Sequence, residues 1–126
     1  MSANQFKVAV IGAGNAGLEL LDRLFKAEFI DIIGVADKNA QAPGMLLAKE
    51  HSIPVTTDMF DLLQDNSQID IIIDVTGIKS VRDALRYHMR ETHNDHTVIM
   101  HERISALLIS LFNGKMVETK ASDEFY

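Results

Sequence analysis

The chain has 126 residues, no cysteine and a formal net charge of −6 at pH 7. This acidic balance argues against a nucleic-acid partner, because proteins that bind nucleic acids usually present a basic face. The missing cysteines exclude disulfides, thiol catalysis and cysteine-based metal clusters, and no apolar run approaches the roughly 18 residues of a membrane span. We therefore expect one folded domain in the cytoplasm, without membrane insertion.

The first predicted elements are a strand over 6–11 and a helix that begins near Asn15, joined by a glycine-rich turn. Gly12 permits the tight turn, Gly14 lets the backbone approach a phosphate, and Gly17 lets the helix lie close to the strand. The N–H groups at the helix start then face the phosphates. The motif predicts a dinucleotide pyrophosphate site, with a purely structural turn as the alternative.

A second predicted strand over 30–36 strengthens this interpretation. It ends in Asp37, which follows Gly17 by twenty residues, the distance at which an acid reaches the adenosine ribose hydroxyls. Between the two strands, apolar residues recur at helical spacing, at Leu18, Leu21, Leu24 and Phe25. Strand, glycines, helix, strand and acid together favour nucleotide binding over a plain turn.

The rest of the chain alternates between apolar runs and amphipathic segments. Pro54 favours a sheet edge, Thr57 or Asp58 caps a helix, and Ser80 with Asp83 resembles a capping box. Asn113-Gly114 marks the end of the last helix. The elements expected after Asp37 are helix 45–50, strand 53–55, helix 58–64, strand 69–75, helix 80–90, strand 97–100 and helix 103–112.

This alternation predicts an α/β fold of three layers. The sheet has about five mainly parallel strands in the order 3-2-1-4-5, with helices on both faces. The ligand site then lies in the crevice over the carboxyl ends of the first and fourth strands. We expect one Rossmann-like domain over residues 1–114, followed at 115–126 by a tail or the start of a linker.

The stretch from Val35 to Gly77 narrows the choice among dinucleotide folds. It resembles the N-terminal NAD(P)-binding domain of the glucose–fructose oxidoreductase and inositol dehydrogenase family, and is also similar to that domain in homoserine and aspartate dehydrogenases. The resemblance covers roughly residues 5–112. The residues that carry it are Val35-Ala36-Asp37, Pro43-Gly44, Ala48, Ile53-Pro54-Val55, Asp58, Leu62-Leu63 and the run from Asp70 to Gly77.

The resemblance implies a role for each candidate binding residue. Asp37, with Lys38 beside it, would bind the adenine ribose, and Thr76 and Gly77 would lie near the nicotinamide half. An acid at Asp37 favours NAD over NADP, because a 2′-phosphate would meet its charge, while Lys38 softens that preference and keeps NADP as the alternative. The pyrophosphate would be held by Gly12, Gly14, Asn15, Ala16 and Gly17.

The same resemblance leaves catalysis open. Sugar dehydrogenases of this family carry Glu-Lys-Pro after the fifth strand, and the lysine serves catalysis. This chain has Met100-His101-Glu102-Arg103 there, without a lysine. His101 and Arg103 lie near the expected nicotinamide, so His101 joins the candidate cofactor-binding residues. The pair is either a proton donor and a charge clamp or two surface residues at a helix start. We assign no catalytic residue.

Two further groups of polar residues also have a functional and a structural interpretation. His88, His93 and His96 gather around one predicted loop, beside acidic residues, but their spacing matches no standard zinc pattern, so we expect no metal site. Asp74 interrupts an apolar strand. It is either a carboxylate with a shifted pKa near the site or an acceptor for neighbouring backbone N–H groups.

The last predicted helix is apolar on most of its surface. One face should cover the sheet, and a second favours contact with another copy of the chain or a neighbouring domain; burial in the sheet's outer layer is the alternative. We expect a domain that binds NAD(H) as a sensory or nucleotide-binding part of a larger protein, similar to N-terminal domains of bacterial signalling proteins. The alternatives are an NAD-dependent oxidoreductase completed by another subunit or domain, and an interaction domain without a ligand.

Overall fold

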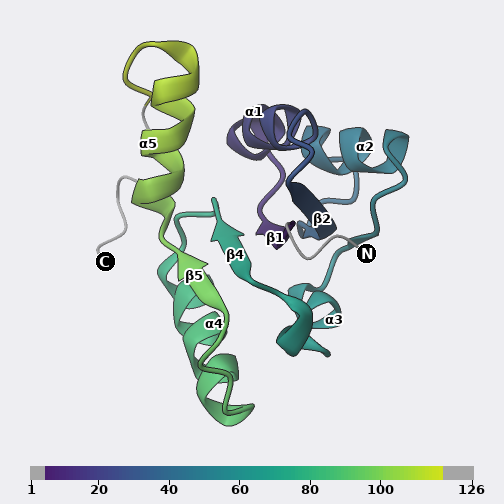
Figure 1. The fold of residues 1–126 in the computed structure, drawn as a ribbon, viewed down its shortest axis with the longest axis vertical. Helices are drawn as coiled ribbons and strands as arrows, with labels where there is room; N and C mark the ends of the chain where they lie inside the picture. The colour runs from purple at the N-terminus through teal and green to yellow at the C-terminus, as the bar shows by residue number, and fades with distance from the viewer. Residues whose placement is uncertain (1–4, 118–126) are drawn as a thin grey trace.

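A five-stranded parallel sheet organises the computed structural model, which describes residues 5–117 (Figure 1). The strand order is β3-β2-β1-β4-β5, so the predicted α/β fold and strand order are confirmed. The elements are β1 (Phe6–Ile11), α1 (Asn15–Leu24), β2 (Ile30–Ala36), α2 (Pro43–Glu50), β3 (Val55–Thr56), α3 (Met59–Leu62), the 3₁₀ helix η1 (Asn66–Gln68), β4 (Ile71–Asp74), α4 (Lys79–Glu91), β5 (Val98–Met100) and α5 (Glu102–Asn113).

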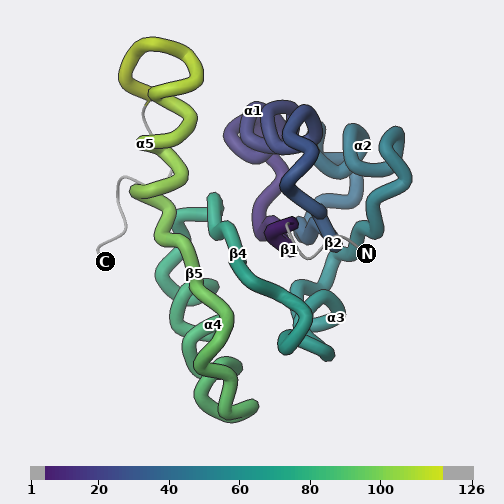
Figure 2. Tube along the Cα trace, viewed as in Figure 1, coloured from purple at the N-terminus to yellow at the C-terminus, as the bar shows by residue number. Residues whose placement is uncertain are grey.

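Each face of the sheet has its own apolar core, because successive side chains of a strand point to opposite faces. Val8 and Val10 of β1 belong to the core formed with α1, α2 and α5. Ala9 and Ile11 belong to the core formed with α3 and α4. Figures 1 and 2 show the two groups of helices on opposite sides of the sheet. Burial on both faces explains why β1 is apolar throughout its second half.

The segment between β2 and β4 differs most from the sequence prediction. The strand predicted at 53–55 is β3, only two residues long, because Pro54 has no N–H and contributes only its carbonyl, which accepts from Val35 N–H at 3.0 Å. It lies at the sheet edge, as Pro54 indicated. The helix predicted at 58–64 shrinks to α3, although Asp58 caps it by accepting from Phe60 N–H at 3.0 Å.

The capping box predicted at the start of α4 is wrong. The helix begins at Lys79 with Ile78 as its N-cap, so Ser80 is already inside the first turn and is not in the position from which a hydroxyl caps a helix. The Asp83 carboxylate instead pairs with Lys79 Nζ at 2.7 Å, one helical turn away. Both side chains are exposed, so this pair contributes little stability.

The end of α5 follows the prediction. Gly114 adopts a left-handed conformation with φ of +71° and stops the helix. Beyond it, Val117 N–H donates to Ser110 Oγ at 2.9 Å and turns the chain back toward α5. The rest of the segment expected as a tail or linker, residues 118–126, lies outside the described residues.

One face of α5 packs on the sheet and a second apolar face does not. Ser105 and Ile109 are buried, whereas Ile104, Leu107 and Leu111 are 45%, 53% and 67% exposed. The sequence left two alternatives for the second face, which were contact with another chain or domain and burial in the sheet's outer layer. Within the described residues, the second alternative is wrong. Among residues 5–117, no helix is long and apolar enough to span a membrane.

Candidate functional site

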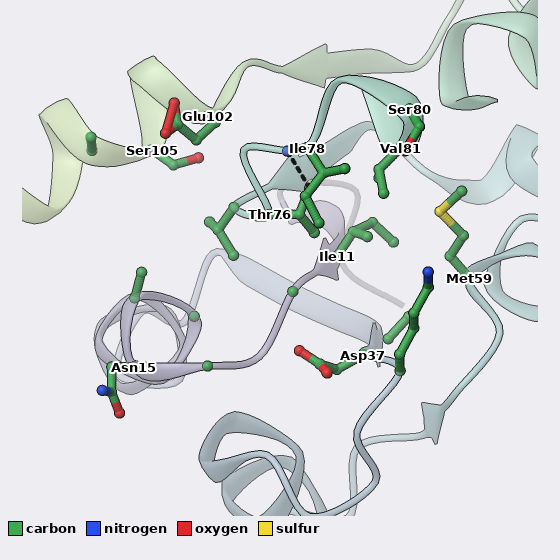
Figure 3. A pocket seen from close by; sticks show the side chains of 18 of the residues that line it. Ile11, Asn15, Asp37, Met59, Thr76, Ile78, Ser80, Val81, Glu102 and Ser105 are labelled. Carbon is green, nitrogen blue, oxygen red and sulfur yellow. Dashed lines mark hydrogen bonds between the residues drawn. The ribbon is translucent and has the colours of Figure 1, made fainter. Parts of the chain in front are cut away.

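A cavity of about 570 Å³ opens at the carboxyl ends of the strands and extends between α1 and α5 (Figure 3). It is lined by the glycine turn, the turn after β2, the start of α3, the turn after β4 and one side of α5. Eight of the ten predicted site residues line it, namely Gly12, Gly14, Asn15, Ala16, Gly17, Asp37, Lys38 and Thr76.

The glycine turn has the geometry that its sequence predicts. Gly12 has φ of +99°, a conformation that side chains disfavour, and a Cβ there would lie 2.9 Å from Val75 Cγ2. A Cβ on Gly17 would clash with the carbonyl oxygen of Gly12, so only glycine lets α1 approach β1 this closely. Both glycines are therefore fixed by close packing at this turn.

The N-terminus of α1 faces the cavity without a side-chain cap. Its N-cap residue is Gly14, and the first turn contains no acidic side chain. The first N–H groups of a helix have no partner inside the helix, and the helix dipole makes this end attractive to anions. Asn15, Ala16 and Gly17, which supply those N–H groups, line the cavity. The arrangement can bind a phosphate.

Asp37 is held in place at the cavity edge by two backbone N–H groups. Its Oδ2 accepts from Ala13 N–H at 2.7 Å and its Oδ1 accepts from Asn39 N–H at 2.8 Å. Ala13 is also fixed from the other side, because its carbonyl accepts from Gly44 N–H at 2.7 Å. The carboxylate thus links the glycine turn to the turn after β2, where the exposed Lys38 also lines the cavity.

Asp74 and Thr76 form a compact turn after β4. Asp74 Oδ1 accepts from Thr76 N–H at 2.9 Å and from Thr76 Oγ1 at 2.7 Å. Both interpretations of Asp74 therefore apply: it accepts a neighbouring backbone N–H, and burial raises its pKa. Gly77, with φ of +65°, continues the turn but is not among the residues that line the cavity.

His101 caps α5 and also lies outside the cavity lining. Its Nδ1 accepts from Arg103 N–H at 2.9 Å, and its Nε2 lies 3.0 Å from Arg82 Nη1. Burial lowers the pKa of His101, and the Arg82 charge lowers it further. The exposed Arg103 lies outside the cavity as well. His101 and Arg103 therefore lie at the start of α5, as in the second of the two interpretations, and it is Glu102 between them that lines the cavity.

Several residues that line the cavity were not identified from the sequence. One group surrounds the start of α3, a second follows Thr76, and a third lies on α5 (Figure 3). Glu102 could have been predicted from the sequence, because it closely follows a strand whose carboxyl end was expected near the site. The missed residues include Thr57, Asp58, Met59, Phe60, Ser80, Val81, Glu102, Ser105, Ala106 and Ile109.

The histidines near the end of α4 have separate partners. His88 Nε2 lies 3.1 Å from the Leu63 carbonyl oxygen, and His96 Nε2 lies 2.8 Å from Asp70 Oδ1. In residues 5–117, no group of three or more histidine, aspartate or glutamate side chains is placed to hold a metal ion.

Known structures share this fold. Homoserine dehydrogenase from S. aureus aligns with a TM-score of 0.60 at 20% identity, covering 87% of this chain and 30% of that one. GenD2 from gentamicin A biosynthesis, solved in complex with NAD, aligns with a TM-score of 0.56 at 18% identity, covering 80% and 35%. At these identities the likeness extends to the fold alone.

Sequence comparison identifies the family. An acetaldehyde dehydrogenase from Chloroflexus aurantiacus is 33% identical over 94 residues, covering 71% of this chain and 31% of that protein. One from Carboxydothermus hydrogenoformans is 30% identical over 78 residues, covering 62% and 26%. The alignments thus span about a quarter to a third of these relatives. The family described as "Oxidoreductase family, NAD-binding Rossmann fold" matches residues 6–109, and the chain belongs to this family.

Proposed function

We propose that the chain binds NAD(H) as a sensory or nucleotide-binding domain of a larger protein. The observation that carries this proposal is the uncapped N-terminus of α1, which faces the cavity beside the fixed carboxylate of Asp37. One element suits a pyrophosphate and the other suits ribose hydroxyls. Membership of a family with an NAD-binding fold supports the same ligand.

In this proposal the dinucleotide lies across the carboxyl ends of the strands. Asp37 accepts hydrogen bonds from the adenosine ribose, with Lys38 beside it. Thr76, Gly77 and His101 are on the nicotinamide side. Thr76 lines the cavity there, whereas Gly77 and His101 lie next to residues that line it. The pyrophosphate is held by Gly12, Gly14, Asn15, Ala16 and Gly17.

We further propose a preference for NAD over NADP. The Asp37 carboxylate is held by two backbone N–H groups, so it does not move aside easily for a 2′-phosphate. Asp58 also lines this end of the cavity, which adds a second negative charge. Lys38 is the nearby cation and reduces the preference without removing it.

The surroundings of the domain follow from α5. We propose a domain over residues 1–114, followed at 115–126 by a tail or the start of a linker. A neighbouring domain or a second copy of the chain would contact the exposed apolar face of α5. Since α5 also lines the cavity, a bound ligand can alter the element that contacts the partner, which suits a signalling protein. The cysteine-free composition supports a cytoplasmic location.

Isothermal titration of the purified chain with NAD⁺, NADH and NADP⁺ tests this function. We expect saturable binding of NAD⁺ or NADH, with NADP⁺ binding about tenfold more weakly because of the charge at Asp37. A thermal-shift assay with the same ligands checks that the observed heat reports binding to the folded chain. The proposal fails if neither NAD⁺ nor NADH gives heat or raises the melting temperature.

The second candidate is an NAD-dependent oxidoreductase whose active site is completed by another subunit or domain. It is favoured by the acetaldehyde dehydrogenases among the relatives and by the small share of their length that the alignments span. A dehydrogenase needs walls that position the substrate and exclude water. NADH formation from aldehydes by the chain, alone or with its natural partner, would support this candidate.

A further inference from the structure

Four titratable or charged side chains meet between β4, α4 and the start of α5. Asp74, Arg82 and Glu102 are only 1%, 6% and 7% exposed, although charged groups are rarely buried to this extent. Arg82 Nη1 lies 3.0 Å from His101 Nε2, and Ser105 Oγ lies 3.4 Å from the Asp74 carbonyl oxygen. We call Asp74 and Glu102 the acid pair.

The acid pair has an electrostatic environment that penalises two negative charges. Burial raises the pKa of Asp74, and the nearby charge of Glu102 raises it further. Among the described residues, Glu102 Oε1 is buried without a hydrogen-bond partner. Arg82, His101 and Arg103 are the cationic or titratable groups around the pair, and the pKa of His101 is lowered. A buried carboxyl whose pKa is raised, as that of Asp74 is, holds its proton to a higher pH than an exposed carboxyl does.

The acid pair lies at one end of the cavity. Glu102 and Thr76 line it, and Thr76 is hydrogen-bonded directly to Asp74. Figure 3 shows Glu102 and Ser105 on one side of the cavity and Asp37 on the opposite side, with Thr76 between them. In a dinucleotide fold, the two halves of the ligand lie on the two halves of the sheet. With the adenosine at Asp37, the nicotinamide ring lies toward the acid pair.

We infer that the acid pair makes this site selective for the oxidised nicotinamide ring, which carries a positive charge, over the neutral reduced ring. This inference rests on the proposed function and adds the redox form that the site recognises. A cation and a proton both neutralise the pair, so they compete. Binding of NAD⁺ therefore releases the proton held at Asp74 to solvent, and binding of NADH leaves that proton in place. Charge is conserved, because one positive charge enters as another leaves.

The wild-type chain gives the first test. Titration with NAD⁺ and with NADH between pH 5 and 8.5, in two buffers with different ionisation enthalpies at each pH, measures affinity and proton release together. We expect NAD⁺ to bind about tenfold more tightly than NADH at the upper pH, with a preference that falls toward the lower pH. Equal binding of the two forms at every pH, or tighter binding of NADH, would overturn the inference and leave the proposed function intact.

Substitutions identify the groups responsible. Glu102→Gln and Asp74→Asn each remove one charge at nearly constant volume, and we expect each to abolish proton release and bring the NAD⁺ and NADH affinities to within about twofold. Glu50→Gln, at the exposed end of α2, is the matched control and should behave as the wild type does. His101→Gln tests whether the imidazole is the source of the proton. We expect proton release to persist in this variant, and its loss would contradict the inference. Proton release that persists in both acid-pair variants contradicts the inference.

If a variant does not fold, the buffer comparison on the wild-type chain still decides the question. If neither nucleotide binds to the folded wild-type chain, the proposed function itself fails. Failure of the redox selectivity and failure of the proposed function are distinguishable. If only the selectivity fails, both nucleotides still raise the melting temperature; if the proposed function fails, neither does.

Discussion

At the scale of single residues, the site depends on groups with more than one role. Asp37 accepts two backbone N–H groups and also presents its charge to the cavity. Gly17 is both the third glycine of the motif and the point where α1 touches β1. Substitutions at such positions affect stability and binding together, so each one needs a control that affects only stability.

Gly17→Ala should destabilise the fold as well as the site. The added Cβ would meet the carbonyl oxygen of Gly12, and the obstacle is backbone that cannot rotate away. We expect a loss of about 2–4 kcal/mol in the free energy of unfolding, measured by urea denaturation. Gly114→Ala is the control, because nothing lies within 4 Å of its Cβ and only the positive φ opposes it. It should cost about 1 kcal/mol, and equal losses in the two variants would contradict this account.

Asp37→Asn should weaken NAD⁺ binding about tenfold and leave NADP⁺ binding unchanged or stronger. The amide keeps one acceptor oxygen but loses the negative charge that repels a 2′-phosphate. Competition titrations with the two nucleotides measure the change in preference. Asp95→Asn, in the exposed loop before β5, should leave both affinities as they are. An unchanged ratio in the Asp37 variant would show that this carboxylate does not set the preference.

Asp74→Asn should change how stability depends on pH. Burial raises the pKa of Asp74 in the folded chain, so the wild type loses stability as the pH rises from the ordinary carboxyl pKa to the raised one. The amide cannot ionise, and its oxygen can still accept from Thr76 N–H and Oγ1. Relative to the wild type, the variant should therefore gain stability from about pH 4 upward, until the pH passes the raised pKa of Asp74 and the gain becomes constant. Thermal unfolding across this range measures the difference, and a constant difference would exclude the effect.

At the scale of elements, the predictions were best for helices and strands whose apolar pattern extends over many residues. The predicted bounds of β2 and the predicted start of α1 match the structure. The segment after β2 was harder, because β3 is short and only becomes a strand by pairing with β2. Likewise, η1 depends on a distant contact, since Asn66 Nδ2 donates to Thr92 Oγ1 at 2.9 Å. Local patterns do not contain such contacts.

The exposed face of α5 leads to a separate prediction. Leu107→Glu combined with Leu111→Glu should change the free energy of unfolding by less than about 1 kcal/mol, because both side chains are mostly exposed. We expect the wild-type chain to self-associate through this face at high concentration and the double variant to remain monomeric, as measured by sedimentation equilibrium. Ile109→Glu, on the buried side of the same helix, should unfold the domain.

Two outcomes decide between the possible partners of α5. A wild-type chain that stays monomeric at its highest soluble concentration assigns the face to a neighbouring domain. A double variant that associates as strongly as the wild type shows that the contact lies elsewhere.

At the scale of the whole molecule, the sequence predicted the sheet and one half of the site. The glycine turn and Asp37 belong to one continuous stretch, so their spacing alone indicated the adenosine and pyrophosphate side. The nicotinamide side is assembled from the turn after β4 and the start of α5, which meet only in the fold. For this reason the sequence analysis selected His101 as a candidate site residue, whereas in the structure its neighbour Glu102 lines the cavity.

The glycine turn is the place where the proposed dinucleotide binds. A ¹H–¹⁵N correlation spectrum of the labelled chain, recorded during titration with NAD⁺ and with NADH, tests it residue by residue. We expect saturable shifts of the amide signals from Gly12 to Gly17 and around Asp37, with little change in the loop after α4. Spectra that do not change at excess nucleotide, or shifts confined to surfaces away from the glycine turn, would contradict it.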